Sequence, residues 1–588
     1  MQITFMGECA LLVRLADQIS QAAHRRVMRL FAALDAMPPQ GVVDLVPAYA
    51  SLLIRFDPLV TCGEALEERV RALARTKLDV AKRRRRLVRI PVAYGGADGP
   101  DLEDVARQLG LSAEAVVQQH TEREYHVYFL GFMAGFPYMG DLPDALAVPR
   151  LAVPRPRVPA GSVAIVGRQT GIYPRDLPGG WRIIGRTALH LFDPTHEPPA
   201  LLRPGDRVRF EAASERVVWT DAADGIAAQS STDGGIPWVR VEEPGWLSTV
   251  QDLGRPGYGR YGVSPSGAAD VDALRLGNAL VDNPPGAAAL EVTLGGVRLE
   301  VLAASAVAIT GAECEARSGR RVVRHGSVIR LTPGERLDIG TPRTGMRTYV
   351  CVAGGVATPL VLGSRSTDVR VGIGGLDGRP LRRGDVLTRG GGPVDAARMA
   401  GRRLPEGSDR SMSAAAGWSL RVLAMSQVQD TADTLAALVS SQFTVDPRSD
   451  RVGVRLRRTE DAGGETIPGG ELLTEGVVRG AIQVPPGGEP ILLLADHQTT
   501  GGYRVPAVVI AADQWKLGQL RPGDTVRFAL CTPDEAVAEL RVHAAWLDGL
   551  PLAVTNAVSR ADGDGDRLDA AALMRGFAEW SEEAGSDT

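Results

Sequence analysis

The first 80 residues alternate between short apolar runs and longer stretches with helical spacing. Two apolar runs, Ala10–Leu15 and Ser51–Phe56, flank a helical pattern at Gln21–Ala36, and a second helical pattern covers Cys62–Ala81. Apolar residues three or four positions apart predict an amphipathic helix, whereas short apolar runs predict strands. The resulting β-α-β-β-α order predicts a small α+β domain at residues 1–82, with a ferredoxin-like arrangement.

Strands and turns dominate the pattern from residue 83 to residue 213. A strand at Leu87–Val92 is followed by two short helical patterns, Asp101–Leu109 and Ser112–His120. Ser112 is the expected N-cap of the second helix. The remaining short apolar runs end at Phe210, and they predict a β-rich domain.

One phrase occurs twice, which predicts that one structural unit is used at least twice. The first copy is Val158–Ile165 followed by Gln169–Tyr173, and the second is Val484–Ile491 followed by Gln498–Tyr503. Each copy leads to Leu-Arg-Pro-Gly-Asp, where Pro and Gly predict a turn into an alternating strand. Two similar β units packed together leave a cleft, and binding sites favour such interfaces. The two loops are therefore the first candidate site.

Two stretches rich in small and polar residues, at 214–236 and near Gly390–Gly417, divide the second half of the chain. Residues 214–236 are predicted to be a linker, and 237–395 a β-rich domain with a helix at Gly267–Val281. Residues 396–545 form a last β domain that carries the second copy of the phrase, and 546–588 a partly helical tail.

Composition narrows the class of protein. The 68 Gly and 39 Pro among 588 residues exceed the roughly 12% of average usage, which favours turn-rich β structure. A net charge of −4 gives no reason to expect a nucleic acid or an anionic membrane as partner. No run approaches 18 apolar residues, and the five cysteines contain no Cys-x-x-Cys pair. We therefore expect a soluble, cytoplasmic protein without a metal site.

Lysine is scarce, which limits the chemistry of nucleotide binding. The three lysines are Lys77, Lys82 and Lys516, and none follows glycine in a Gly-x-x-x-x-Gly-Lys-Ser/Thr loop. Any nucleotide must therefore be held by other means.

Two sets of phrases resemble known families. The first half carries Gly131-Phe132-x-x-Gly135-Phe136, Pro154-Arg155, Val158–Val163 and Pro178–Trp181; the second carries Gln251-Asp252-x-Gly254-Arg255, Gly363–Asp368, Ser449-Asp450-Arg451 and Gln498–Tyr503. The first set resembles the KipI or allophanate-hydrolase-subunit-1 family, and the second resembles the KipA or subunit-2 family. Together they cover about residues 1–545. Ala134 stands where the family usually has proline, and Ala269 where it has methionine.

The resemblance implies a mainly β fold, in which the small α+β domain is followed by three cyclophilin-like β-barrels, one in the first half and two in the second. It also implies a function: the fused B and C component of an ATP-dependent 5-oxoprolinase, using ATP with magnesium and a separate A-type subunit of the LamB/YcsF-like kind. The substrate would be a small amide or lactam. The chain could also form a homo-oligomer.

Two alternatives remain open at this stage. The chain could be the carboxyltransferase component of a biotin-dependent urea carboxylase. None of its lysines lies in a biotin-attachment phrase, so biotin would arrive on a separate carrier protein. It could instead be a regulatory binding protein of the histidine-kinase-inhibitor type. The fusion argues against this last reading, because it would join an inhibitor to its own antagonist.

Three residues are candidates for acid–base chemistry: His120, Glu475 and Asp496. A partly buried carboxylate or a histidine can move a proton during lactam hydrolysis. Each could equally be structural, the carboxylates as surface charges and His120 as a core histidine.

The candidate binding residues offer amides, hydroxyls, phenols and guanidinium groups. They are Tyr125, Arg155, Gln169, Thr170, Tyr173, Arg365, Ser366, Thr367, Asp450, Arg451, Gln498, Thr499, Thr500 and Tyr503. The structural alternatives are a left-handed turn in the loop at 498–503, an ion pair between Arg365 and Asp368, and a solvated strand edge at Asp450 and Arg451.

Overall fold

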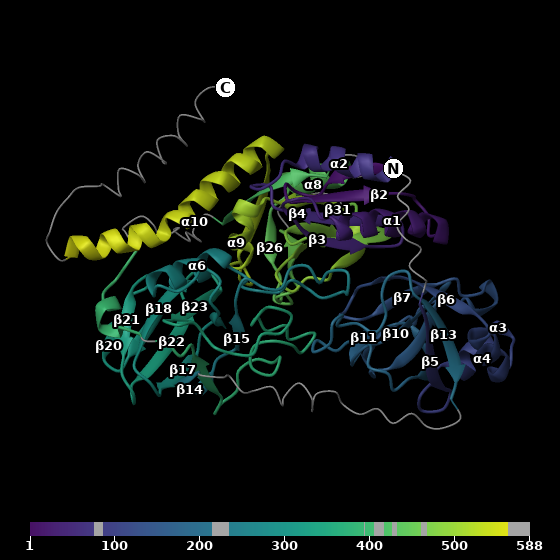
Figure 1. Ribbon diagram of the computed structural model, residues 1–588, viewed down its shortest axis with the longest axis horizontal. Coiled ribbons are helices and arrows are strands. Elements are labelled where there is room, and N and C mark those ends of the chain that lie inside the picture. The colour runs from purple at the N-terminus through teal and green to yellow at the C-terminus, as the bar shows by residue number, and fades with distance from the viewer. Residues whose placement is uncertain are drawn as a thin grey trace.

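The computed structural model describes residues 1–75, 86–213, 235–392, 394–404, 417–425, 432–459 and 467–561. These residues form four packed units (Figure 1). Most of the predicted linker and the tail beyond residue 561 lie outside the described residues.

The N-terminal unit is a four-stranded antiparallel sheet with two helices. Its elements are β1 (Gln2–Phe5), β2 (Ala10–Arg14), α1 (Gln21–Ala36), β3 (Val42–Pro47), β4 (Ser51–Phe56) and α2 (Gly63–Arg75). The sheet order is β1-β2-β4-β3, so β4 lies between the strands that α1 connects, as in a split β-α-β unit. The predicted α+β domain is confirmed, with β1 as one strand more than the predicted order.

The first barrel occupies residues 87–212. Its elements are β5 (Leu87–Tyr94), α3 (Leu102–Leu109), α4 (Ala113–Thr121), β6 (Glu124–Leu130), β7 (Pro137–Gly140), η1 (Asp144–Leu146), β8 (Arg155–Val158), β9 (Ser162–Val166), β10 (Gln169–Ile172), β11 (Leu177–Gly179), β12 (Arg182–Arg186) and β13 (Arg207–Ala212). The barrel closes in the order β10-β7-β6-β13-β5-β12-β9, and β8 and β11 form a separate pair. Ser112 caps α4 as predicted, because its Oγ accepts the Ala115 N–H at 3.2 Å.

The middle unit consists of two packed sheets. Its elements are β14 (Ile236–Pro244), β15 (Leu247–Gln251), α6 (Val271–Leu280), β16 (Ala289–Thr293), β17 (Val297–Val301), β18 (Ser305–Gly311), β19 (Cys314–Ser318), β20 (Arg321–Val323), β21 (Val328–Leu331), β22 (Arg336–Pro342), β23 (Arg347–Val352), β24 (Val386–Arg389) and α7 (Ala396–Met399). The sheets have six and five strands.

This arrangement differs from the third closed barrel that we expected at residues 237–395. Within the described residues no strand pairing joins the two sheets, which instead share a core that includes Trp238, Leu290, Leu299 and Val350. Packed sheets and a barrel both need alternating apolar residues, so the sequence pattern does not separate them.

The C-terminal barrel repeats the design of the first. Its elements are β25 (Trp418–Ala424), α8 (Ala432–Ser440), β26 (Phe443–Val445), β27 (Gly453–Arg458), β28 (Glu471–Gly476), β29 (Ala481–Val484), β30 (Ile491–Leu493), β31 (Thr500–Val509), η5 (Ala511–Asp513), α9 (Gln514–Leu517), β32 (Thr525–Leu530) and α10 (Pro533–Ala561). Pairing of β25 with β31 closes the sheet, and β28 extends it outside the ring. In each barrel the first strand pairs in parallel with the strand after the Pro-Gly-Asp turn, which confirms the repeated unit.

The N-terminal unit and the C-terminal barrel pack together. The N-terminal unit lies on the C-terminal barrel (Figure 1), where Leu12, Val46 and Leu53 share a buried cluster with Val477 and Val508. Helix α10 begins inside the segment that we assigned to the last barrel, and it packs on α6 through Leu547 and Leu550. Among the described residues, no helix has the length and apolar character needed to cross a bilayer.

Candidate functional site

A small pocket lies where the first barrel, the middle unit and the C-terminal barrel meet. The first barrel contributes the loop 132–134, the middle unit Gly262, Ser264, Asp368, Arg370 and Val371, and the C-terminal barrel residues 496–498. We call this the junction pocket. Its walls therefore come from both halves of the chain.

Asp496 is held in the wall of the junction pocket by a buried ionic network. Arg451 donates to it twice, from Nε to Oδ2 at 2.8 Å and from Nη2 to Oδ1 at 3.0 Å. Arg451 Nη1 also donates to Glu291 of the middle unit. The Ser266 hydroxyl adds a hydrogen bond to Asp496 Oδ1 at 2.7 Å. This network holds Asp496 in one orientation and ties the two C-terminal units together.

Asp368 is the second carboxyl of the junction pocket, and its surroundings differ. Its Oδ1 accepts the backbone N–H groups of Arg370 at 3.1 Å and Val371 at 3.0 Å. Burial, with the nearby charge of Asp496, raises the pKa of Asp368 to about 6. Two neighbouring carboxyls with different environments are typical of acid–base sites.

The backbone at the junction pocket is strained in two places. Phe132 has φ of 63° and Ser266 has φ of 55°, in the left-handed region that residues other than glycine seldom adopt. Such strain persists where the surrounding structure fixes it, and it often accompanies binding sites. At Ser266 it accompanies the hydroxyl contact to Asp496.

The two halves approach closely beside the pocket. A Cβ added to Gly131 would lie 2.2 Å from Thr500 Oγ1 of the C-terminal barrel. A Cβ on Gly262 would lie 2.8 Å from the Met133 carbonyl oxygen. Gly131 lies against the Thr500 hydroxyl and Gly262 against the Met133 backbone, so a larger residue at either position would separate the two halves.

The second copy of the repeated phrase contributes to the junction pocket, whereas the loop Gln169–Tyr173 of the first copy does not line it. Gln498 lines it, and its Nε2 donates to Gln483 Oε1 at 3.1 Å. Thr499 and Thr500 follow as buried residues, and Thr499 Oγ1 has no hydrogen-bond partner among the described residues. Of the sequence candidates, the structure brings Asp496 and Gln498 into the lining, with Arg451, Thr499 and Thr500 next to it.

The segment Arg365–Thr367 does not line the junction pocket but forms hydrogen bonds to β15 and to Asp252. Ser366 Oγ donates to Asp252 Oδ1 at 2.5 Å, and Thr367 Oγ1 donates to the Val250 carbonyl at 3.0 Å. The Arg365 backbone N–H donates to Asp252 Oδ2 at 2.6 Å. The expected alternative of an ion pair between Arg365 and Asp368 is not formed, because Asp368 faces the pocket instead.

His120, Tyr125 and Thr170 lie together inside the first barrel. His120 is fully buried between Tyr94 Oη at 2.8 Å and Thr170 Oγ1 at 3.1 Å. Tyr125 donates its phenol proton to the His120 carbonyl at 2.9 Å. Burial lowers the pKa of His120 to about 3, so the ring is neutral at pH 7. Both ring nitrogens are engaged away from the junction pocket.

The remaining candidates of the first barrel lie around its end. Arg155 forms a two-pronged ion pair with Asp101, at 2.6 and 2.9 Å. Tyr173 is buried edge-on against Phe136, and burial raises the pKa of its phenol to about 12. Gln169 pairs with Val166 in the turn between β9 and β10.

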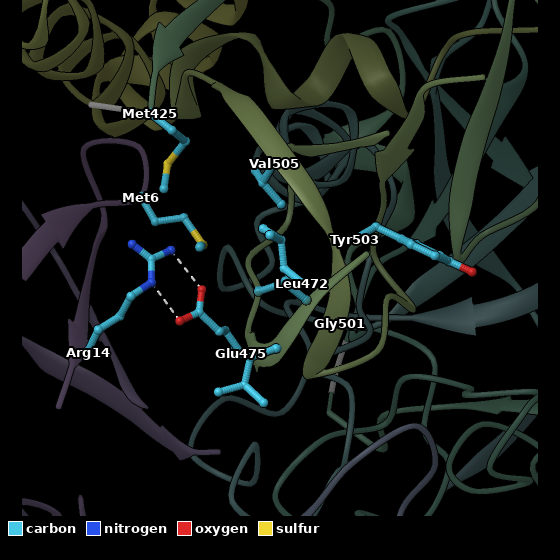
Figure 2. A pocket seen from close by; sticks show the side chains of 11 residues that line it. Met6, Arg14, Met425, Leu472, Glu475, Gly501, Tyr503 and Val505 are labelled. Atoms are coloured by element: carbon cyan, nitrogen blue, oxygen red, sulfur yellow. Dashed lines mark hydrogen bonds and ion pairs between the residues drawn. The ribbon is translucent and has the colours of Figure 1, made fainter. Parts of the chain in front are cut away.

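Glu475 and Tyr503 line a different pocket, between β2 of the N-terminal unit and β28 and β31 of the C-terminal barrel. Arg14 and Glu475 point toward each other there, while Tyr503 extends away from the pair (Figure 2). Tyr503 is 39% exposed. Asp450 is exposed, and its Oδ1 accepts two backbone N–H groups of its own turn.

Sequence reasoning missed Asp368, Arg370 and Ser266. Asp368 closes the family phrase Gly363–Asp368, so it was visible as a motif residue but not as a member of the pocket. Ser266 belongs to the phrase Gly262-Val263-x-x-Ser266-Gly267 that also carries the resemblance, so it too was visible as a motif residue only. Nothing in the sequence alone marks Arg370, because its role depends on how the units dock.

The junction pocket does not fit magnesium-bound ATP well. The oxygens of Asp496 are already engaged by Arg451 and Ser266, which leaves Asp368 as its one available carboxyl. No group of three or more His, Cys, Asp or Glu that could hold a metal occurs in the described part of the chain. A magnesium ion needs oxygen ligands in octahedral geometry, and the described residues of this pocket do not supply them.

Comparisons with known proteins agree with this two-part construction. A family model described as carboxyltransferase domain, subdomain C and D, matches residues 1–202, and one described as carboxyltransferase domain, subdomain A and B, matches 261–530. The chain is 41% identical over 229 residues to the B-type component of 5-oxoprolinase from Bacillus subtilis, which covers 37% of this chain and 94% of that protein. It is 38% identical over 308 residues to the C-type component of 5-oxoprolinase from Escherichia coli, and the match covers 51% of this chain and 93% of that protein.

Two further matches extend the comparison. The crystal structure of TTHA0988 matches with a TM-score of 0.77 and 38% identity, over 88% of this chain and 99% of that chain. Urea amidolyase of Lachancea kluyveri is 31% identical over 308 residues, 49% of this chain but 16% of that protein.

The fold and the junction pocket define a protein built from two docked carboxyltransferase-type halves, and the chain belongs to the carboxyltransferase-domain family. Within it, the chain joins homologues of the B-type and C-type components of 5-oxoprolinase in one polypeptide. The predicted resemblance is confirmed. The chain is thus an enzyme component whose relatives are subunits, and urea amidolyase represents a related branch.

Proposed function

We propose that this chain is the cytoplasmic B and C component of an ATP-dependent 5-oxoprolinase, which opens the lactam of 5-oxoproline to glutamate. One observation carries the proposal: the junction pocket takes its lining from both the B-like half and the C-like half of the chain. Neither half has the whole site alone. Fusion holds the halves at a high effective concentration, which suits one shared site and does not suit an inhibitor joined to its antagonist.

The side chains of the pocket suit proton transfer to a lactam. Asp368 titrates near neutrality, so it can protonate the leaving amine or activate water. Asp496 is held by Arg451 and fixes the Ser266 hydroxyl. In this proposal His120 and Glu475 have structural roles, because their side chains are engaged outside the pocket.

ATP would supply the driving force by phosphorylating the unreactive lactam carbonyl. Because the junction pocket offers neither a phosphate loop nor a metal cluster, we propose that the A-type subunit of the LamB/YcsF-like kind completes the nucleotide site. Substrate and nucleotide would meet where that subunit docks.

The test is glutamate and ADP release from 5-oxoproline and ATP by the purified chain, with and without an A-type subunit. Turnover that needs both proteins, and that falls at least 100-fold in Asp368→Asn, supports the proposal. Absence of turnover with an A-type subunit that is active with its own B and C partners overturns it.

A carboxyltransferase acting on urea is the second candidate, supported by the family-model descriptions and by the urea amidolyase match. Transfer of carboxylate from an added carboxybiotin carrier protein to urea would establish it. Failure of that transfer, together with 5-oxoproline turnover, would exclude it.

A further inference from the structure

Arg370 is a cation in the junction pocket whose side chain has no hydrogen-bonded partner among the described residues. It lines the pocket and follows Asp368 in a tight turn, where its backbone N–H donates to the Asp368 carboxyl at 3.1 Å. Its guanidinium forms no hydrogen bond or ion pair with any residue that the structure describes. Since the side chain is half-buried, it has lost part of its water contact without gaining a protein partner.

The neighbouring carboxyls do not balance this charge. Asp496 is engaged on both oxygens by Arg451 and Ser266. Asp368 receives two backbone N–H groups, and its charge acts on Arg255 and Arg175 as well as on Arg370. One carboxylate therefore does not balance three guanidinium groups. The pocket therefore has room for one more negative charge, and a ligand can provide it.

Gln498 gives the pocket a matching amide. Its Nε2 is committed to Gln483 Oε1 at 3.1 Å, so within the described residues its Oε1 remains available as an acceptor. A carbonyl oxygen of this kind can accept one hydrogen bond from a lactam N–H. A guanidinium can hold a carboxylate through two parallel N–H···O bonds.

We propose that Arg370 is the specificity-determining residue of the junction pocket and binds the carboxylate of a cyclic amide acid, whose lactam N–H is accepted by Gln498. The inference rests on the proposed function and deepens it, because it states why the site takes a lactam acid in preference to a neutral amide. Urea and 2-pyrrolidinone lack the carboxylate and cannot use Arg370.

The test compares Arg370→Gln with Arg298→Gln, the same change in an exposed surface ion pair of the middle unit. Each variant is assayed with the A-type subunit and ATP on 5-oxoproline and on 2-pyrrolidinone. A charge-assisted hydrogen bond is worth about 10- to 100-fold in affinity. In Arg370→Gln we expect KM for 5-oxoproline to rise by about that factor. KM for ATP and the activity on 2-pyrrolidinone should change less than about 3-fold. Arg370→Lys should recover part of the lost affinity for 5-oxoproline. Arg298→Gln should match the unchanged protein.

Several outcomes would overturn the inference while leaving the proposed function intact. One is normal 5-oxoproline turnover with an unchanged KM in Arg370→Gln. Another is an equal loss on both lactams or a raised KM for ATP, since Arg370 would then contact a phosphoryl group. If the unchanged protein processes urea with carboxybiotin and Arg370→Gln does so equally well, both the inference and the proposed function fail.

Discussion

Arg14 and Glu475 lie 461 positions apart in the chain and form a two-pronged ion pair, with Nε to Oε1 at 2.6 Å and Nη2 to Oε2 at 2.7 Å (Figure 2). The pair joins the N-terminal unit to the C-terminal barrel beside the methionines Met6 and Met425. Glu475, which the sequence analysis proposed as a catalytic carboxylate, is therefore paired with Arg14 and lies away from the junction pocket.

The first prediction concerns this pair. Glu475→Gln should lower the free energy of unfolding by about 1 kcal/mol, because the pair is largely but not fully buried. Glutamate formation should change less than about 3-fold. A double-mutant cycle with Arg14→Gln, followed by urea unfolding, measures the coupling. A loss of turnover above about 100-fold with normal stability would instead make Glu475 catalytic.

The second prediction concerns the pH dependence that Asp368 imposes. Its folded-state pKa of about 6 is above the unfolded value of about 3.9. Its contribution to stability is therefore complete below about pH 4 and is lost as the pH rises through 6. Between about pH 4 and pH 6, the free energy of unfolding of Asp368→Asn should therefore increase relative to that of the unchanged protein, by up to about 1.4 kcal/mol per pH unit. Urea unfolding from pH 4 to 8 measures this, and a constant difference would contradict the assignment.

The third prediction concerns the contact between the halves. Gly131→Ala would place a Cβ 2.2 Å from Thr500 Oγ1, and such overpacking costs about 1–3 kcal/mol. We expect glutamate formation to fall, and a second change, Thr500→Ala, to restore part of it. Gly487→Ala is the matched control, because a Cβ there meets nothing within 4 Å. Equal effects of Gly131→Ala and Gly487→Ala on thermal unfolding would argue against a close contact.

The fourth prediction concerns His120. Burial lowers its pKa to about 3, below the ordinary value of about 6.5, so its stabilising contribution is present above pH 6.5 and is lost as the pH falls toward 3. As the pH falls from 6.5 toward 3, the free energy of unfolding of the unchanged protein should decrease by up to about 1.4 kcal/mol per pH unit more than that of His120→Gln. The slopes of unfolding free energy against pH decide this. Parallel slopes would mean that the ring is not buried as a neutral group.

Local features of the fold could be predicted from the sequence because local chemistry determines them. The spacing at Gln21–Ala36 gave helix α1 with the same bounds, and Ser112 caps α4 through its own hydroxyl. The repeated phrase and the two Pro-Gly-Asp turns predicted a unit used twice, and both copies are closed barrels. Turns, helix caps and the alternation of apolar and polar residues depend on residues a few positions apart, so they can be predicted from one sequence.

Only the tertiary structure decided which motif residues meet. Arg365 and Asp368 are neighbours in the sequence, yet the Arg365 backbone bonds to Asp252 while Asp368 lines a pocket with Asp496 and Gln498. The middle unit has the alternation of a barrel but forms two packed sheets. The physical reason is the same in both cases. Contacts across hundreds of residues form when whole units dock and bury their apolar faces, and alternation along one strand does not specify which unit covers it.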